Sequence, residues 1–239
     1  MARDPSNLKK ILPVSGERKA IIDVSHVPEY DIANWDLHDE GDFKRYMKWT
    51  ESVIRSSFEY RRFIYYLKSF SDMNHCSVLT RVTNQDSSNI KIEIHHEPLT
   101  LYDILIAVLY KRTGMREDLD EYQVSKEVMY WHYRGLVGLI PLCELVHELV
   151  HNQYIFIPST IVVGRWKEFV RLYQKYIPDD TLNTLEKIEE ISKVYDLNAV
   201  RDILEPYIVE LRDPNRTNAE EMLTYIKGKL NEYNTSLVA

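Results

Sequence analysis

The sequence predicts a mostly helical α+β fold. Over residues 42–70, apolar side chains recur at spacings near three and four, the period of an amphipathic helix. Over residues 76–96 the period changes to two, as in a strand with one buried face. Beyond residue 166 the helical period returns, with many acidic groups. We therefore expect a small sheet set among helices.

Length and composition are those of a globular protein. The chain has 239 residues with only 7 glycines and 9 prolines, so long low-complexity stretches are not expected. The formal net charge of -7 counts against a largely basic surface, although a local basic patch can coexist with acidic helices. The cysteines Cys76 and Cys143 are too few for a four-cysteine zinc site and favour a reducing compartment. With neither a signal core nor an apolar run of bilayer length, the expected location is cytoplasmic, with no membrane contact.

The N-terminal part is expected to contain an irregular arm, with a short strand at 20–24, followed by the helix over 42–70. That helix interleaves arginines with aromatic rings, a mixture that suits phosphate contact and base stacking. A core helix with a solvated charged rim explains the same mixture. The candidate nucleic-acid-binding residues are Arg55, Arg61 and Arg62, with Arg81 on the following hairpin, where a solvent-facing strand residue is the alternative.

A β-hairpin is expected next. Residues 76–82 and 89–95 have the strand period, and the polar residues 83–88 would join them. Because side chains alternate along a strand, His95 points away from the face that carries the isoleucines, and His96 lies where the strand ends.

Helices are expected to make up most of the remaining chain. Thr100 is a plausible N-cap for an apolar helix over 99–113, and a second helix should cover 120–133. A later helix beginning near residue 142 would be followed by a short strand at 154–158. The C-terminal region is helical and acidic, which favours packing on the core or contact with a protein partner. It is divided at Pro178, Pro206 and Pro214.

Two histidine doublets carry the chemical signal. His95 and His96 are adjacent at a strand end, whereas His147 and His151 are four apart, one turn along a helix. Such a helical pair presents two nitrogens to one metal ion, and a strand packed against it can supply the third. A remaining neutral imidazole can take a proton near neutral pH. Metal-assisted phosphodiester hydrolysis needs both functions. The alternative is that these side chains cap a strand and line a polar helix face.

The run Ile94-His95-His96-Glu97-Pro98, followed by His147-x3-His151, resembles the HNH, or ββα-metal, endonucleases, and is especially similar to colicin nuclease domains. The resemblance covers about residues 74–158. It implies a ββα-metal core over 73–158 with a helical insertion at about 99–133. An N-terminal arm and basic, aromatic helix (1–72) and a C-terminal helical region (159–239) would flank this core.

The resemblance also implies a function and its residues. His95, His147 and His151 would hold one divalent metal ion (Mg, Mn, Ni or Zn), and His96 would be the general base in hydrolysis of DNA. Such proteins are common in bacteriophages.

The chain departs from the HNH pattern at Gly138, nine positions before His147, where the family has an asparagine that orients the general base. Two alternatives to an active nuclease therefore stay open. One is a catalytically inactive HNH-like binding or structural protein that engages a protein partner through its C-terminal helices. The other is a protein–protein adaptor without metal. Only the nuclease requires His96.

Overall fold

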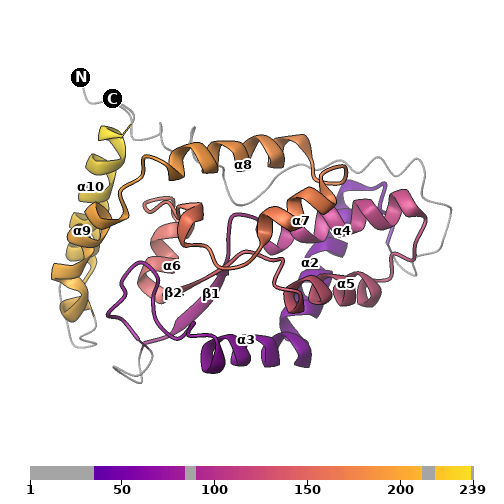
Figure 1. Cartoon of the computed structure of the whole chain (residues 1–239), viewed down its shortest axis with the longest axis horizontal. Helices are drawn as coiled ribbons and strands as arrows, with labels where there is room; N and C mark the ends of the chain where they lie inside the picture. The colour runs from indigo at the N-terminus through magenta and orange to yellow at the C-terminus, as the bar shows by residue number, and fades with distance from the viewer. Residues whose placement is uncertain (1–34, 84–89, 212–218, 238–239) are drawn as a thin grey trace.

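The computed structural model describes residues 35–83, 90–211 and 219–237, and within these ranges it is mostly helical with one two-stranded sheet (Figure 1). This confirms the predicted mostly helical α+β fold. The strand expected at 20–24 and most of the loop expected at 83–88 lie outside the described residues. In chain order the elements are α2 (Glu40–Ser56), α3 (Phe58–Phe70), β1 (Ile92–His96), α4 (Leu101–Met115), α5 (Glu121–Tyr133), β2 (Leu139–Cys143), α6 (Glu144–His151), the 3-10 turn η1 (Ser159–Ile161), α7 (Trp166–Tyr173), α8 (Asp179–Ser192), α9 (Leu197–Leu211) and α10 (Ala219–Ser236).

Ser57 divides the single helix expected over 42–70 into α2 and α3. Its backbone is extended, with φ -64° and ψ 151°. Its N–H donates to the Ile54 carbonyl at 3.1 Å, and its Oγ accepts from the Tyr60 N–H at 3.0 Å. One serine thus ends the first helix and caps the second. The expectation of one helix was wrong. The apolar period continues across the break, and only a serine with capping chemistry marks where one helix ends and the next begins.

The sheet pairs β1 with β2, antiparallel, with His95 opposite Ile140. The first strand of the expected hairpin, residues 76–82, is instead a turn, in which the Cys76 N–H donates to the Val82 carbonyl at 2.8 Å. Arg81 is exposed in this turn rather than on a strand. A strand with one buried face cannot bury all the apolar side chains of this segment, whereas the turn buries every one: Cys76, Val78, Leu79 and Val82.

Close backbone contacts position β2. Pro141 has no N–H, but its carbonyl accepts from the Ser77 N–H at 2.9 Å, so its backbone faces away from β1 and the ladder loses no hydrogen bond. Just before the strand, Gly138 lies against the Glu97 backbone. A Cβ at Gly138 would stand 2.0 Å from the Glu97 carbonyl oxygen. The position therefore excludes a side chain, which accounts for glycine where the HNH pattern has asparagine.

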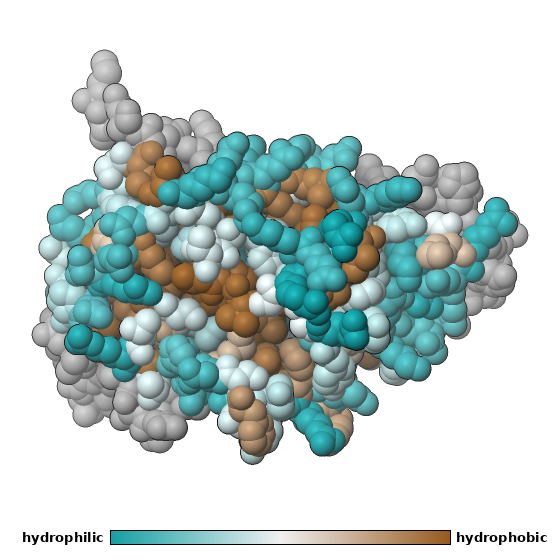
Figure 2. Space-filling view, viewed as in Figure 1, coloured by the Kyte–Doolittle hydropathy of each residue, from teal (hydrophilic) through white to brown (hydrophobic). Residues whose placement is uncertain are grey.

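Helices enclose the sheet at both ends of the molecule. In Figure 1, α2, α4 and α5 lie at one end and α9 and α10 at the other, with the sheet and α6 between them. The helices at the first end share a core, in which the buried Tyr46 hydroxyl donates to the Leu119 carbonyl at 2.7 Å. On the face seen in Figure 2, hydrophobic residues gather in the centre with hydrophilic residues around them. No helix of the described ranges is long and apolar enough to span a bilayer.

Two expectations for the second half of the chain need correction. Residues 154–158 are not a strand; they lie between α6 and η1 with Ile155, Phe156 and Ile157 buried. Pro206 does not divide the C-terminal helices but lies inside α9. A proline removes one helical hydrogen bond, and the helix continues past it despite that cost. Pro178 does mark a boundary, as the N-cap of α8, and Pro214 is outside the described residues.

We predict that Gly138→Ala lowers the free energy of unfolding by about 1–3 kcal/mol, the usual cost of forcing atoms into a packed site. The matched control is Gly228→Ala in α10, where nothing lies within 4 Å of the added Cβ. This variant should be at least as stable as wild type, because alanine favours a helix over glycine by up to about 1 kcal/mol. Urea unfolding followed by circular dichroism measures both. Equal stability of the two variants would contradict the close approach at Gly138.

Candidate metal centre

The short strand β1 sends its two adjacent histidines to opposite sides of the sheet. His95 faces α6, where its ring centroid is 5.1 Å from that of His147. His96 faces the helical core, where it is 5% exposed and its Nε2 lies 2.9 Å from Nε2 of His132. This alternation is the one predicted from the strand period.

The three histidines predicted as metal ligands come together. Nitrogens of His95, His147 and His151 all lie within 4.8 Å of one another. The two histidines of α6 are one turn apart, and their Nε2 atoms are separated by 3.0 Å. His95 reaches them because α6 begins directly after β2, with Cys143 as its N-cap, and packs beside β1. We call these three residues the histidine cluster.

Two carboxylates adjoin the histidine cluster. Glu93 shares the strand face of His95, and its Oε2 accepts from Nδ1 of His147 at 2.7 Å. This contact holds the proton of neutral His147 on Nδ1, so its Nε2 lone pair faces the other imidazoles. Carboxylate partners of this kind orient metal-binding histidines. Glu97 is more distant, with Oε2 at 3.5 Å from Nε2 of His95.

The surroundings of His147 and His151 favour the neutral form of both imidazoles. Partial burial lowers the pKa of both His147 and His151, and the neighbouring His95 lowers it further. Glu93 acts in the opposite direction, whereas the Arg55 guanidinium adds to the lowering. Lone pairs are therefore available at neutral pH, which is the state in which imidazole binds a cation.

His96 is not part of the histidine cluster. Nδ1 of His132 lies 2.8 Å from the Val128 carbonyl, an acceptor, so this nitrogen carries the proton of neutral His132. Nε2 of His132 can then accept a hydrogen bond from Nε2 of His96. Burial holds the pKa of His96 well below its usual range, and His132 lowers it further. Burial also lowers the pKa of His132, to about 4. The pair is thus a neutral, hydrogen-bonded unit of the core, stacked beside Tyr60.

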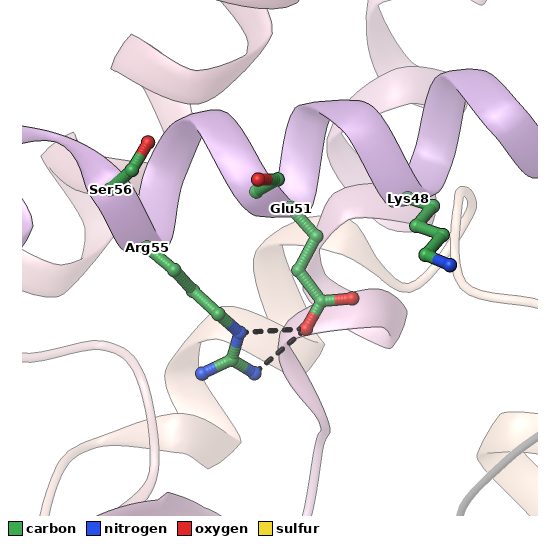
Figure 3. A pocket seen from close by; sticks show the side chains of 5 residues that line it. Lys48, Glu51, Arg55 and Ser56 are labelled. Carbon is green, nitrogen blue, oxygen red and sulfur yellow. Dashed lines mark hydrogen bonds and ion pairs between the residues drawn. The ribbon is translucent and has the colours of Figure 1, made fainter.

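The four candidate arginines are all exposed. Of these four, only Arg55 contributes to the lowered pKa of His147 and His151. It lies at the end of α2 and bonds to Glu51 through Nε at 3.0 Å and through a second guanidinium nitrogen at 2.7 Å. Figure 3 shows both bonds, with Lys48 extending to the same side of α2, in an open hollow lined by this helix. Arg61 and Arg62 lie on α3, and Arg81 lies in the 76–82 turn.

Sequence reasoning did not single out Glu93 or His132 as site residues. Glu93 could have been found, because its two-residue spacing from His95 places it on the same strand face. His132 has no neighbour in sequence at ligand spacing, and its pairing with His96 depends on how α5 packs on the sheet. No sequence pattern marks that contact.

A model of the bacteriophage G278-like virion protein family matches residues 13–235. The chain belongs to this family, which confirms the expectation of a bacteriophage protein. The family description indicates the phage particle rather than the cytoplasm as such. Neither the curated proteins nor the solved structures gave a match. These comparisons leave the nuclease resemblance untested.

We predict that the metal-stripped protein binds one Zn²⁺ or Ni²⁺ and that His147→Ala abolishes this binding. Glu93→Gln should weaken it by about 10–100-fold, the usual effect of removing a carboxylate that orients a ligand. Isothermal titration calorimetry at neutral pH measures the stoichiometry and affinity. His75→Ala, in a histidine outside the cluster beside Asp72, is the matched control and should bind as wild type. Unaltered binding by His147→Ala would rule out the cluster as the site.

Proposed function

We propose that this chain is a metal-dependent nuclease of the phage particle that hydrolyses phosphodiester bonds of DNA. The observation that supports it is the convergence of His95, His147 and His151, from a strand and a helix, within 4.8 Å. The order strand, strand, helix over β1, β2 and α6 agrees with the HNH resemblance, and α4 and α5 lie between the two strands, where that resemblance expects an insertion.

The donor set fits one divalent cation. Three imidazole ligands favour transition metals such as Zn²⁺ and Ni²⁺ in simple affinity, and the colicin-like resemblance admits Mg²⁺ and Mn²⁺. Exposure of His151 leaves the cluster accessible from solvent. When bound, such an ion would supply a Lewis acid for the phosphate oxygens.

The residues of the chain supply orientation and charge around that position. Glu93 fixes the ring of His147 through the Nδ1–H hydrogen bond of 2.7 Å. Arg55 is an exposed cation whose charge lowers the pKa of His147 and His151, and it could attract a phosphate if its ion pair with Glu51 exchanged. Neither role depends on the buried core.

The general base has two candidates. The resemblance assigns His96, but this side chain is 5% exposed and paired with His132, so a water could reach it only after the pair separates. The geometry favours the carboxylate of Glu97, which lies beside His95 on the cluster side of the sheet. A carboxylate there can accept a proton from a water molecule.

A second candidate function is an inactive HNH-like binding or structural protein of the virion. Two observations favour it: Gly138 leaves no room for the asparagine of the HNH pattern, and His96 is buried. In that case the histidine cluster would serve stability, and the acidic C-terminal helices would contact a protein partner. A metal-free adaptor is the simplest form of this alternative.

The test is nicking of supercoiled plasmid with Mg²⁺, Mn²⁺, Ni²⁺ or Zn²⁺, with EDTA as the blank. Metal-dependent nicking is expected in wild type and His75→Ala, and its loss in His147→Ala. Removing a general base typically costs about 10²–10⁴-fold in rate. We expect that loss in Glu97→Gln, whereas His96→Ala should retain activity once thermal melting confirms that it is folded.

The outcomes distinguish the two candidate bases and the two candidate functions. A folded His96→Ala protein that cannot cut, beside an active Glu97→Gln protein, would return the base to His96. A folded wild-type protein that cuts with none of these ions would reject the nuclease in favour of the binding protein.

A further inference from the structure

Helix α3 carries a stripe of aromatic rings and arginines on its exposed side. Its members recur at helical spacing: Phe58, Arg61, Arg62, Tyr65, Tyr66 and Phe70. All six are exposed, and the four rings are between 54% and 71% exposed. We call this set the α3 stripe. Soluble proteins rarely leave several large rings together in water unless the surface binds something.

Packing of the opposite side of α3 against the core holds the α3 stripe in place. The opposite side of the helix is buried through Tyr60, which stacks beside His96, and Phe63, whose ring centroid is 5.5 Å from that of His132. Lys68 also donates to the Ile92 carbonyl of β1. The helix therefore holds its exposed side chains in place before any ligand arrives, which reduces the ordering cost of binding.

The exposed rings form a platform toward the end of the helix. Phe70 lies against Tyr66 with ring centroids 5.7 Å apart and planes at 28°, and its centroid is 6.4 Å from that of Tyr65. Phe58, one end of the stripe, lies three residues after Arg55. The stripe thus extends from the start of α3, close to Arg55 in the chain, to a group of three exposed rings at its end.

We propose that the α3 stripe binds an unpaired nucleic-acid strand, with bases stacked on its rings and phosphates on Arg61 and Arg62. Within the described ranges, neither arginine forms an ion pair with a carboxylate, and α3 contains a single acidic residue, Glu59. Aromatic faces accept any base, and exposed arginines between the rings favour the phosphates of a strand over an apolar protein surface. In a duplex the base faces are covered by stacking, so the rings select an unpaired strand.

This inference deepens the proposed function, since it names the form of DNA, and it rests on that function for the link to cleavage. The α3 helix lies at the lower edge of Figure 1, and α6 lies on the other side of β1. The corresponding edge of Figure 2 mixes hydrophobic and hydrophilic side chains, as a surface of rings and arginines would.

The experiment is fluorescence anisotropy of the full chain in EDTA at low salt. The probes are a labelled oligothymidylate of about 16 nucleotides and a duplex of equal length. Wild type should bind the single strand at least fivefold more tightly than the duplex. Tyr65→Ala with Phe70→Ala should weaken single-strand binding by about tenfold or more. Arg61→Gln with Arg62→Gln should reduce the salt dependence by about one to two ions.

Exposed residues of the same types on other helices are the controls. Tyr122→Ala in α5 and Arg171→Gln in α7 should bind as wild type, and circular dichroism should show unaltered helix content in every variant. Equal affinity of the stripe variants and wild type for the single strand would overturn the proposal. A change of sedimentation in the stripe variants, with no change in DNA binding, would also overturn it and assign the stripe to contact between protein subunits.

The stripe proposal is tested by strand binding and the nuclease proposal by cleavage, so either proposal can fail without the other. A strand bound in EDTA through the stripe, by a protein that cuts with no metal, supports the stripe and rejects the nuclease. Metal-dependent nicking by a protein whose stripe variants bind the single strand as wild type supports the nuclease and rejects the stripe.

Discussion

The antiparallel pairing of β1 with β2 is the contact on which the candidate site depends. It brings together two segments separated by the helical pair α4 and α5, and α6 follows β2 with no intervening residue. The direction of α6 is therefore set by the strand before it, and His147 and His151 come beside His95. The approach of Gly138 to Glu97, whose N–H donates to the Gly138 carbonyl at 3.1 Å, fixes the end of this pairing. A shift by one residue would exchange His95 and His96 between the two faces.

The two adjacent histidines illustrate how strongly position determines chemistry. His95 faces two other imidazoles at an accessible surface, where lone pairs can converge on a cation. His96 enters the core, where an imidazole is tolerated only if its polar atoms have partners, and His132 supplies one. The N–H of neutral His96 can donate to the free Nε2 of neutral His132, which satisfies both atoms without burying a charge. The resemblance to HNH nucleases applies to the spacing of these residues; the virion family to which the chain belongs is matched over nearly all of it.

Local patterns predicted the features that local chemistry sets. The N-cap at Thr100, the helix after Asp120 and the opposite orientations of His95 and His96 all follow from residues close in sequence. The strand pairing could not be predicted from local sequence. Residues 76–82 have strand-like alternation, but they form a turn in which all of their apolar side chains are buried. The partner of His96 was equally hidden, since His132 is 36 residues away and its approach depends on packing. Thus the convergence of His95, His147 and His151 could be predicted from the sequence, whereas the buried environment of His96 could not.

The shared cap at Ser57 makes this part of the chain intolerant of insertions and deletions. A single residue serves as the end of α2 and the start of α3, so there is no loop to absorb a change in length. One residue added after Ser57 would rotate the following helix by about 100° relative to its cap. That rotation would move Tyr60 and Phe63 away from their places beside His96 and His132. In descendants of this sequence, length should therefore vary in other connections while the Ile54–Tyr60 interval stays constant.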